Sequence, residues 1–124
     1  MCEELWHVVF APGSALERIG PDCFYMTRVG KMVIPKGVTK IEHNTFGYCR
    51  SLLEVEFEEG SKLRAIEKEA FNVCCYLAKI NLPEGLKSIE HSAFNYCKRL
   101  TSIRLPDGLE KIGVDCFSYS GLEE

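Results

Sequence analysis

The stretch LAKINLPEGLKSIEHSAFNYCKRL, residues 77–100, decides the fold because its pattern recurs along the whole chain. Within it, an isoleucine precedes a phenylalanine by five residues, as Ile89 precedes Phe94. The same pair returns at steps of 22 to 25 residues. The five pairs are Ile19 and Phe24, Ile41 and Phe46, Ile66 and Phe71, Ile89 and Phe94, and Ile112 and Phe117. Such a fixed period indicates a stacked repeat.

Other positions of the stretch repeat in step with this pair. A small residue follows each phenylalanine by three positions: Thr27, Cys49, Cys74, Cys97 and Ser120. An apolar triplet comes next: Leu5-Val8-Phe10, Val29-Met32-Ile34, Leu52-Val55-Phe57, Leu77-Ile80-Leu82 and Leu100-Ile103-Leu105. A glycine then closes each unit: Gly13, Gly37, Gly60, Gly85 and Gly108.

The triplet predicts a short strand. Its last two members, such as Ile80 and Leu82, are two residues apart and therefore face the same side, while Lys79 and Asn81 face the other. Three apolar positions cannot bury themselves alone, so successive units must stack and pair their strands in parallel. The sequence therefore predicts an α/β solenoid of about five coils of 22–25 residues, wound as a right-handed coil.

The remainder of each unit returns the chain to the next strand. Pro35, Pro83 and Pro106 precede the glycine column and favour a type I turn, and we expect the glycines to hold a positive φ. Residues 89–100 place their apolar side chains at helical spacing, which predicts a short helix or 3-10 turn. The sequence is also compatible with a second short strand at residues 87–89.

Both ends of the chain stop at the same point of the unit. Cys2 aligns with Cys49, and the chain ends just after the position of Ser120. Neither end carries a polar cap, which solenoids need for solubility. We therefore expect residues 1–124 to form one solenoid cut in phase from a longer array, able to self-associate through its uncapped ends.

The spacing LxxIxLPxGLxxIxxxAFxxCxxL, read off residues 77–100, resembles the BspA-like leucine-rich repeat. The resemblance covers essentially the whole chain. It implies a cell-surface or secreted protein of bacteria or parasitic protists that binds host or matrix proteins or promotes adhesion between cells. It implies no catalytic residues. The asparagine ladder of ordinary leucine-rich repeats is missing, because glycines occupy those positions.

Composition excludes several other classes. The 124 residues include 15 Lys and Arg against 18 Asp and Glu, which gives a net charge of −3 without a long basic run. Nucleic-acid binding is therefore not expected. No apolar run reaches the roughly 20 residues that span a bilayer, so membrane insertion is not expected. Met1 is followed by Cys-Glu-Glu, which lacks the basic region of a secretion signal, so no such signal is expected in this sequence.

The cysteine column is interpreted as structural. Threonine and serine replace cysteine at equivalent positions, so the column requires a small, weakly donating side chain, and we expect buried free thiols. A Cys74–Cys97 disulfide remains a less favoured alternative. Cys23 and Cys116 belong to a second small, buried column, whereas Cys75 aligns with charged residues and is expected to be exposed.

No catalytic, cofactor-binding or metal-binding residues are predicted. His43 and His91 occupy equivalent positions about 10 Å apart, too far to share a metal at bonds of roughly 2 Å. Glu42, Glu67 and Glu90 recur because the unit recurs, and we expect them to pair with lysines. No phosphate-binding or nucleophile motif occurs. The chain is therefore not expected to be an enzyme.

The outward residues of the strands are the candidate site, because the core does not dictate them. Solenoids bind proteins through such extended surfaces. The sequence thus predicts protein recognition, and the alternative is a structural spacer with no ligand of its own. A further row, Met26, Tyr48, Val73, Tyr96 and Tyr119, is interpreted as peripheral packing. The candidate protein-binding face consists of Trp6, His7, Val9, Lys31, Val33, Glu54, Glu56, Lys79, Asn81, Ser102 and Arg104.

Overall fold

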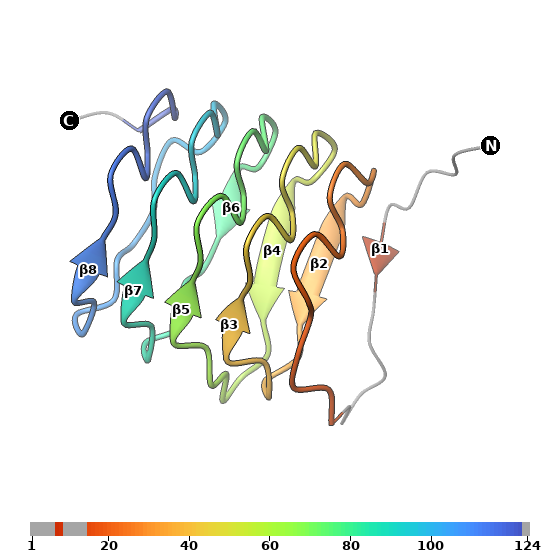
Figure 1. The fold of residues 1–124 in the computed structure, drawn as a ribbon, viewed down its shortest axis with the longest axis vertical. Coiled ribbons are helices and arrows are strands. Elements are labelled where there is room, and N and C mark those ends of the chain that lie inside the picture. Colours follow the sequence, from red (N-terminus) through yellow and green to blue (C-terminus); the bar gives the residue numbers. More distant parts are fainter. Residues whose placement is uncertain (1–6, 9–14, 123–124) are drawn as a thin grey trace.

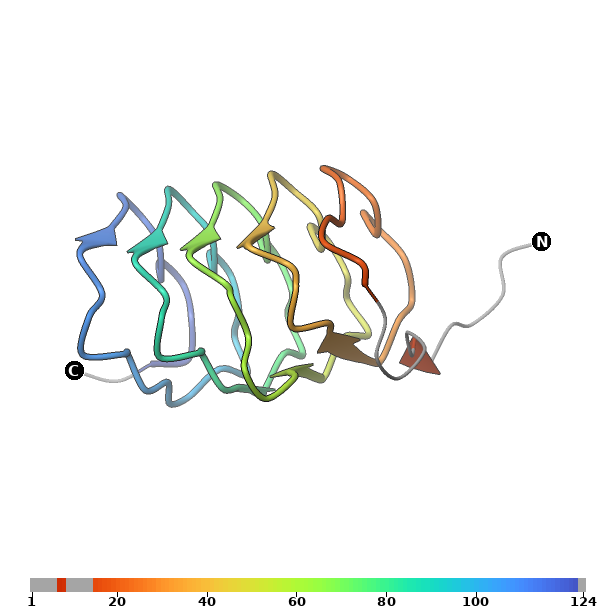
Figure 2. The same ribbon diagram turned by 90° about the horizontal axis from the view of Figure 1, so that it is seen from below.

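The computed structural model describes residues 7–8 and 15–122, and these form two parallel sheets of four strands each. The two sheets lie on opposite sides of the coil (Figures 1 and 2). Sheet A has the order β1 (His7–Val8), β2 (Lys31–Ile34), β4 (Glu54–Phe57) and β6 (Lys79–Ile80). Sheet B has the order β3 (Lys40–Ile41), β5 (Ala65–Ile66), β7 (Ser88–Ile89) and β8 (Lys111–Ile112). Each of the three middle coils thus adds one strand to each sheet, so the parallel-strand solenoid is present together with the second short strands.

The predicted triplets fill the interior beneath sheet A. Met32 of β2 pairs in register with Val55 of β4, and Val55 pairs with Ile80 of β6. All three side chains are buried. In sheet B, Ile41, Ile66 and Ile89 align in the same way and are fully buried. The two sheets therefore enclose one continuous apolar core.

The phenylalanine column forms a stack along the axis. Neighbouring rings from Phe24 to Phe117 have centroids 5.2 to 5.5 Å apart and planes within 7° of parallel. Phe46, Phe71 and Phe94 are completely buried. Each such ring contributes about 1.5–3 kcal/mol through burial. The stack confirms that successive coils share an interior.

The return segments are turns, and residues 7–8 and 15–122 contain no helix. The predicted helical turns are therefore not confirmed. Two positions per coil have a left-handed backbone, which interrupts a helix. Ten non-glycine residues take φ values of 55–62° two positions before or after a phenylalanine: Asp22, Met26, Asn44, Tyr48, Glu69, Val73, Ser92, Tyr96, Asp115 and Tyr119. No helix in the described part of the chain is long and apolar enough to cross a membrane.

The prediction of positive φ for the glycine column is mostly wrong. Among the described glycines only Gly60 has a positive φ, of 83°. Gly37 is explained instead by close approach, because a Cβ there would lie 2.9 Å from the carbonyl oxygen of Leu16. The left-handed positions fall on the return turns described above, where the repeat carries no glycine.

The last coil departs from the others on sheet A. Residues 101–105 form no strand, although Ile103 and Leu105 continue the apolar triplet, so the predicted fifth strand is wrong for this segment. Leu105 is 38% exposed, whereas Leu82 of the preceding coil is buried. No described coil covers this end, so burial no longer holds the segment against β6.

Candidate functional site

The outward residues of sheet A occupy the predicted face. Lys31 and Val33 lie on β2, Glu54 and Glu56 on β4, and Lys79 on β6. Each is half-buried or exposed. Of the remaining predicted residues, His7 on β1 pairs in register with Lys31, and Asn81 directly follows β6. Ser102 and Arg104 lie in the irregular segment 101–105. Trp6 and Val9 lie outside the described residues.

Opposite charges alternate across this face. Lys31, Glu54 and Lys79 are aligned by the strand register. The ion pairs are Lys31 Nζ to Glu56 Oε2 at 3.5 Å and Lys79 Nζ to Glu54 Oε2 at 3.8 Å. The pKa of Glu56 is lowered, first by its side-chain hydrogen bond with Glu54 and then by the charge of Lys31. The two lysines and two glutamates of β2, β4 and β6 therefore neutralise one another on this face.

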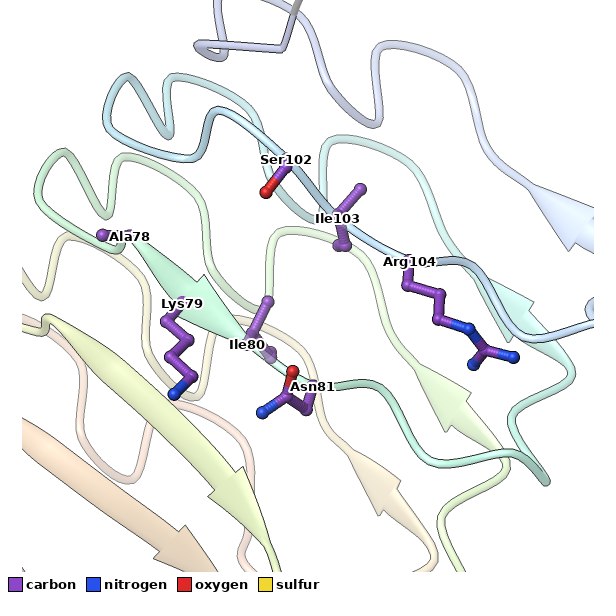
Figure 3. A pocket seen from close by; sticks show the side chains of 7 residues that line it. All are labelled: Ala78, Lys79, Ile80, Asn81, Ser102, Ile103 and Arg104. Carbon is purple, nitrogen blue, oxygen red and sulfur yellow. The ribbon is translucent and has the colours of Figure 1, made fainter.

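The structure brings four predicted residues together around a cleft at the β6 end of sheet A. Lys79 and Asn81 of one coil and Ser102 and Arg104 of the next line this cleft, together with three less polar side chains (Figure 3). Its volume is about 410 Å³, within the range of ligand pockets. Ile80 is buried and Ile103 half-buried, so apolar side chains lie between the polar ones. Such a site can hold an apolar side chain while the surrounding groups donate and accept hydrogen bonds.

The cleft exists because the sheet opens at this point. Earlier coils are joined on this side by backbone bonds such as Leu53 N to Gly30 O at 2.8 Å and Ala78 N to Leu53 O at 3.0 Å. Within the described residues, no backbone hydrogen bond joins 78–82 to 101–105. On the opposite side the same two coils stay closed, with Glu110 N bonded to Lys87 O at 2.8 Å. The edge of β6 that faces residues 101–105 is consequently unpaired, and unpaired strand edges are sites of strand addition.

Glu84 is a residue of this region that the sequence pattern did not identify. Its carboxylate accepts a hydrogen bond from Arg104 Nη1 at 2.5 Å, and this bond raises the pKa of Arg104. Both side chains are well exposed. Glu84 lies in the turn before Gly85, so only the three-dimensional path of the turn places it beside the next coil.

The thiol column is structural. The Sγ atoms of Cys49, Cys74 and Cys97 donate to the carbonyl oxygens of Phe24, Phe46 and Phe71 at 2.9, 3.0 and 3.2 Å, respectively. Burial raises the pKa of Cys97 to about 12 and that of Cys74 well above its usual range. Both are free, so the alternative Cys74–Cys97 disulfide is wrong.

The second cysteine column is confirmed only in part. Cys116 is buried, and burial raises its pKa to about 12. Cys23 is exposed, contrary to prediction. Cys75 is half-buried and the most accessible thiol after Cys23 among the described cysteines.

The repeated glutamates form ion pairs, as predicted. Glu67 pairs with Lys40 at 3.5 Å and Glu90 with Lys111 at 3.1 Å. Glu42 pairs with an arginine instead, since Arg18 Nε donates to its Oε2 at 2.6 Å, and this hydrogen bond lowers the pKa of Glu42.

The two equivalent histidines hydrogen-bond the backbone of the next coil. His43 Nδ1 lies 3.1 Å from Lys68 O, and His91 Nδ1 lies 2.9 Å from Val114 O. Glu67 and Glu90 lie with both histidines around a shallow hollow of about 290 Å³. The described residues contain no group of three or more histidine, cysteine, aspartate or glutamate side chains positioned to hold a metal ion.

Residues 17–124 match the model of the BspA type leucine rich repeat region in six copies. The chain belongs to this family. Members are built as repeat solenoids, which commonly serve as protein-interaction scaffolds. The family therefore agrees with the repeat columns and the two stacked sheets, and it supports the coarse interpretation of an interaction scaffold.

Solved structures of two bacterial leucine-rich repeat proteins are similar. The Treponema pallidum protein TpLRR is 28% identical, with a TM-score of 0.81, over 86% of this chain and 50% of that one. A protein from Eubacterium ventriosum is 24% identical, with a TM-score of 0.58, over 82% of this chain and 34% of that one, and shows the fold alone. This chain thus spans about half the length of TpLRR and about a third of the length of the Eubacterium ventriosum protein. A search of curated proteins finds no match.

Proposed function

We propose that this BspA-type chain is a non-catalytic protein-recognition module that binds an extended segment of a partner at the C-terminal half of sheet A. The observation that carries the proposal is the open edge of β6 beside the cleft of Lys79, Asn81, Ser102 and Arg104. An added strand would pair with the β6 backbone, as in other β-strand additions. The polar side chains and the isoleucines would then select the sequence of the segment.

The charge pattern explains why this half of the face is favoured. Lys31, Glu54 and Glu56 already pair with one another or with Lys79. Exposed pairs of this kind contribute only roughly 0.2–1 kcal/mol each, but they leave less unsatisfied charge for a partner. The cleft instead offers amide and hydroxyl groups, Asn81 and Ser102, which no described side-chain bond occupies.

Selection from a peptide library tests the proposal. A library of random twelve-residue peptides is displayed on phage and selected on the immobilised folded chain, and the enriched peptides are synthesised. We expect Asn81→Ala with Lys79→Ala to weaken peptide binding roughly tenfold through lost contacts at the cleft. Lys111→Ala is the matched control, because Lys111 is 62% exposed and ion-paired on sheet B, whereas Lys79 is 63% exposed on sheet A.

A structural spacer is the second candidate, favoured by the internal pairing of Lys31 and Glu54 with oppositely charged neighbours. A spacer would enrich no peptide, or only peptides whose binding is unchanged by the Lys79 and Asn81 substitutions. Thermal unfolding of each variant establishes that the fold is intact. Either result would reject the recognition role of this cleft.

The larger context of the module is part of the same proposal. Family membership and the partial coverage of TpLRR support a longer surface-exposed or secreted protein with an adhesive role. In that setting residues 1–124 form one solenoid within a longer array. Antibodies raised against this chain should label intact producing cells. Labelling that appears only after the cells are permeabilised would contradict the surface location.

A further inference from the structure

The second half of each turn from sheet B to sheet A carries no carboxylate. The turns that lead from sheet B back to sheet A lie along the top of Figure 1. From each phenylalanine onward these turns comprise residues 24–30, 46–53, 71–78, 94–101 and 117–122, which include four of the fifteen Lys and Arg and none of the eighteen Asp and Glu. We call these residues the turn ridge. The carboxylates of the same turns precede the phenylalanines, at Asp22, Glu42, Glu67, Glu69, Glu90 and Asp115. The remainder of the chain is correspondingly more acidic than the net charge of −3 indicates.

The cations of the turn ridge lie over aromatic rings. Arg50 Cζ is 5.8 Å from the ring centroid of Tyr48, and Arg99 Cζ is 4.9 Å from that of Tyr76. Lys98 lies in the same relation to a neighbouring tyrosine, with Nζ 5.9 Å from the ring of Tyr96. Cation–π contacts at exposed sites hold the cation in place at about 0.5–1 kcal/mol without neutralising its charge.

These cations differ in their partners from those of the two sheets. Lys31, Lys79, Lys40 and Lys111 each pair with a glutamate across a coil boundary. The ion pairs between described residues include none that involves Arg50, Lys98 or Arg99. Arg50, Lys98 and Arg99 therefore present positive charge that no ion pair between described residues compensates.

Apolar side chains are exposed between these cations. Met26 is 64% exposed, Leu53 48% and Tyr76 46%. A hollow of about 410 Å³ lies at one end of the ridge, between Arg28 and Arg50. Exposed apolar groups together with uncompensated charge indicate an interaction surface rather than a solvated edge.

We propose that the turn ridge binds an extended acidic peptide segment that alternates carboxylate and apolar side chains and runs parallel to the solenoid axis. Arginine favours bidentate pairing with carboxylates. Two coil steps separate Arg50 from Lys98, and each step is 5.2 Å in the phenylalanine stack. An extended peptide rises about 3.3 Å per residue, so carboxylates about two to four residues apart reach both cations.

A short acidic peptide fits better than a long polyanion. A nucleic acid or sulfated polysaccharide would extend beyond the ridge and meet the acidic remainder of the surface, which repels it. Screening limits this repulsion to roughly 8 Å at physiological salt, so a segment confined to the ridge meets fewer of these carboxylates than a long polyanion does. This surface lies apart from the sheet A cleft, and its proposal does not depend on the function proposed above.

Fluorescence anisotropy with a defined probe tests the proposal. The probe is a fluorescein-labelled ten-residue peptide of alternating glutamate and leucine, and a glutamine–leucine peptide serves as its uncharged counterpart. We expect Arg50→Glu, Lys98→Glu and Arg99→Glu together to weaken binding of the acidic peptide at least roughly tenfold. The matched control reverses Lys36, Lys62 and Lys87 on the opposite row of turns and should bind as the unchanged chain does.

Protection of Cys75 gives a second measurement that does not need the charge-reversed variant to fold. Cys75 occupies the position of Arg50 and Lys98 in the middle coil of the ridge and is half-buried. In a Cys2→Ser, Cys23→Ser background, the acidic peptide should slow maleimide labelling of Cys75. Any of three results would overturn the proposal: unchanged labelling, equal binding of the uncharged peptide, or tighter ridge binding of heparin or a single-stranded oligonucleotide.

Discussion

The ring of Phe71 lies parallel to that of Phe94, with centroids 5.2 Å apart and an interplanar angle of 7°. Both rings are fully buried, although 23 residues of chain separate them. The contact joins two coils that β5–β7 pairing and the backbone hydrogen bond from Phe71 N to Ala93 O at 2.8 Å also hold in register. The stack adds buried apolar contact between coils that the backbone already aligns.

Truncating the central ring should destabilise the whole array. We expect Phe71→Ala to lower the free energy of unfolding by about 3–5 kcal/mol, because it removes a buried ring and leaves a cavity between two others. Phe117→Ala, at the half-buried end of the stack, should cost less. Urea denaturation measures both. Equal losses at the two positions would show that the stack is not the continuous core.

A substitution that relieves backbone strain at Val73 should stabilise the fold. A β-branched residue at φ 59° is strained, whereas asparagine tolerates this conformation. We expect Val73→Asn to raise the free energy of unfolding by about 1 kcal/mol. Val33→Asn, a half-buried strand position with ordinary backbone, should lower it. A loss of stability in Val73→Asn would mean that packing of this side chain outweighs its strain.

The Arg18–Glu42 pair predicts a pH dependence. Since the hydrogen bond from Arg18 lowers the folded-state pKa of Glu42, the pair stabilises the fold above the unfolded pKa of about 4.3. That contribution disappears as the pH falls through the lower, folded-state pKa. Glu42→Gln should therefore be less stable than the unchanged chain at pH 7, and the difference should shrink below pH about 4.

Urea unfolding from pH 7 to pH 3 measures this difference, and Glu110→Gln is the control because Glu110 is exposed. A difference that stays constant over this range would show that Glu42 acts through packing rather than charge.

Thiol reactivity separates the cysteine columns. In a Cys2→Ser chain, Cys23 and Cys75 should react with a thiol reagent within minutes under native conditions. Cys49, Cys74 and Cys97 should react only on unfolding, since burial raises their pKa values and their thiols donate to backbone carbonyls. Mass spectrometry of the labelled peptides identifies each site. Rapid native labelling of Cys74 would contradict the buried column.

The exposed apolar end of the last coil predicts self-association. Ile112 is 48% exposed and Val114 71%, whereas their counterparts Ile89 and His91 lie against this coil. We expect the chain to associate at high concentration, and Ile112→Glu with Val114→Glu to reduce the association. Light scattering over a concentration series measures it. A monomer at every concentration would show that this end is stable in water.

The sequence predicts the interior of this fold well because every coil buries the same side chains. Ile66, Phe71 and Cys74 have no environment other than their counterparts one coil away, so their positions in the chain specify their positions in space. The parallel-strand solenoid follows from this regularity, whereas the predicted helical turns do not appear in the described residues. The identity of the family follows from the same regularity.

The return turns, the last coil and the cleft depend on features that the repeat does not encode. Residues 89–100 imitate helical spacing, yet Ser92 and Tyr96 are left-handed, and residue type gives no signal for this. Leu100, Ile103 and Leu105 match the earlier triplets, but pairing depends on neighbours that the triplet does not describe. The cleft and the pairing of Arg104 with Glu84 therefore emerge only in three dimensions.

Chemical-shift mapping of a selected peptide tests recognition at sheet A most directly. A ¹⁵N-labelled chain is titrated with a peptide enriched in the library selection, and its amide resonances are followed. We expect the largest shifts at residues 78–82 and 101–105, with slower hydrogen exchange along the outer edge of β6. Shifts confined to sheet B, or no shifts at saturating peptide, would contradict recognition through this cleft.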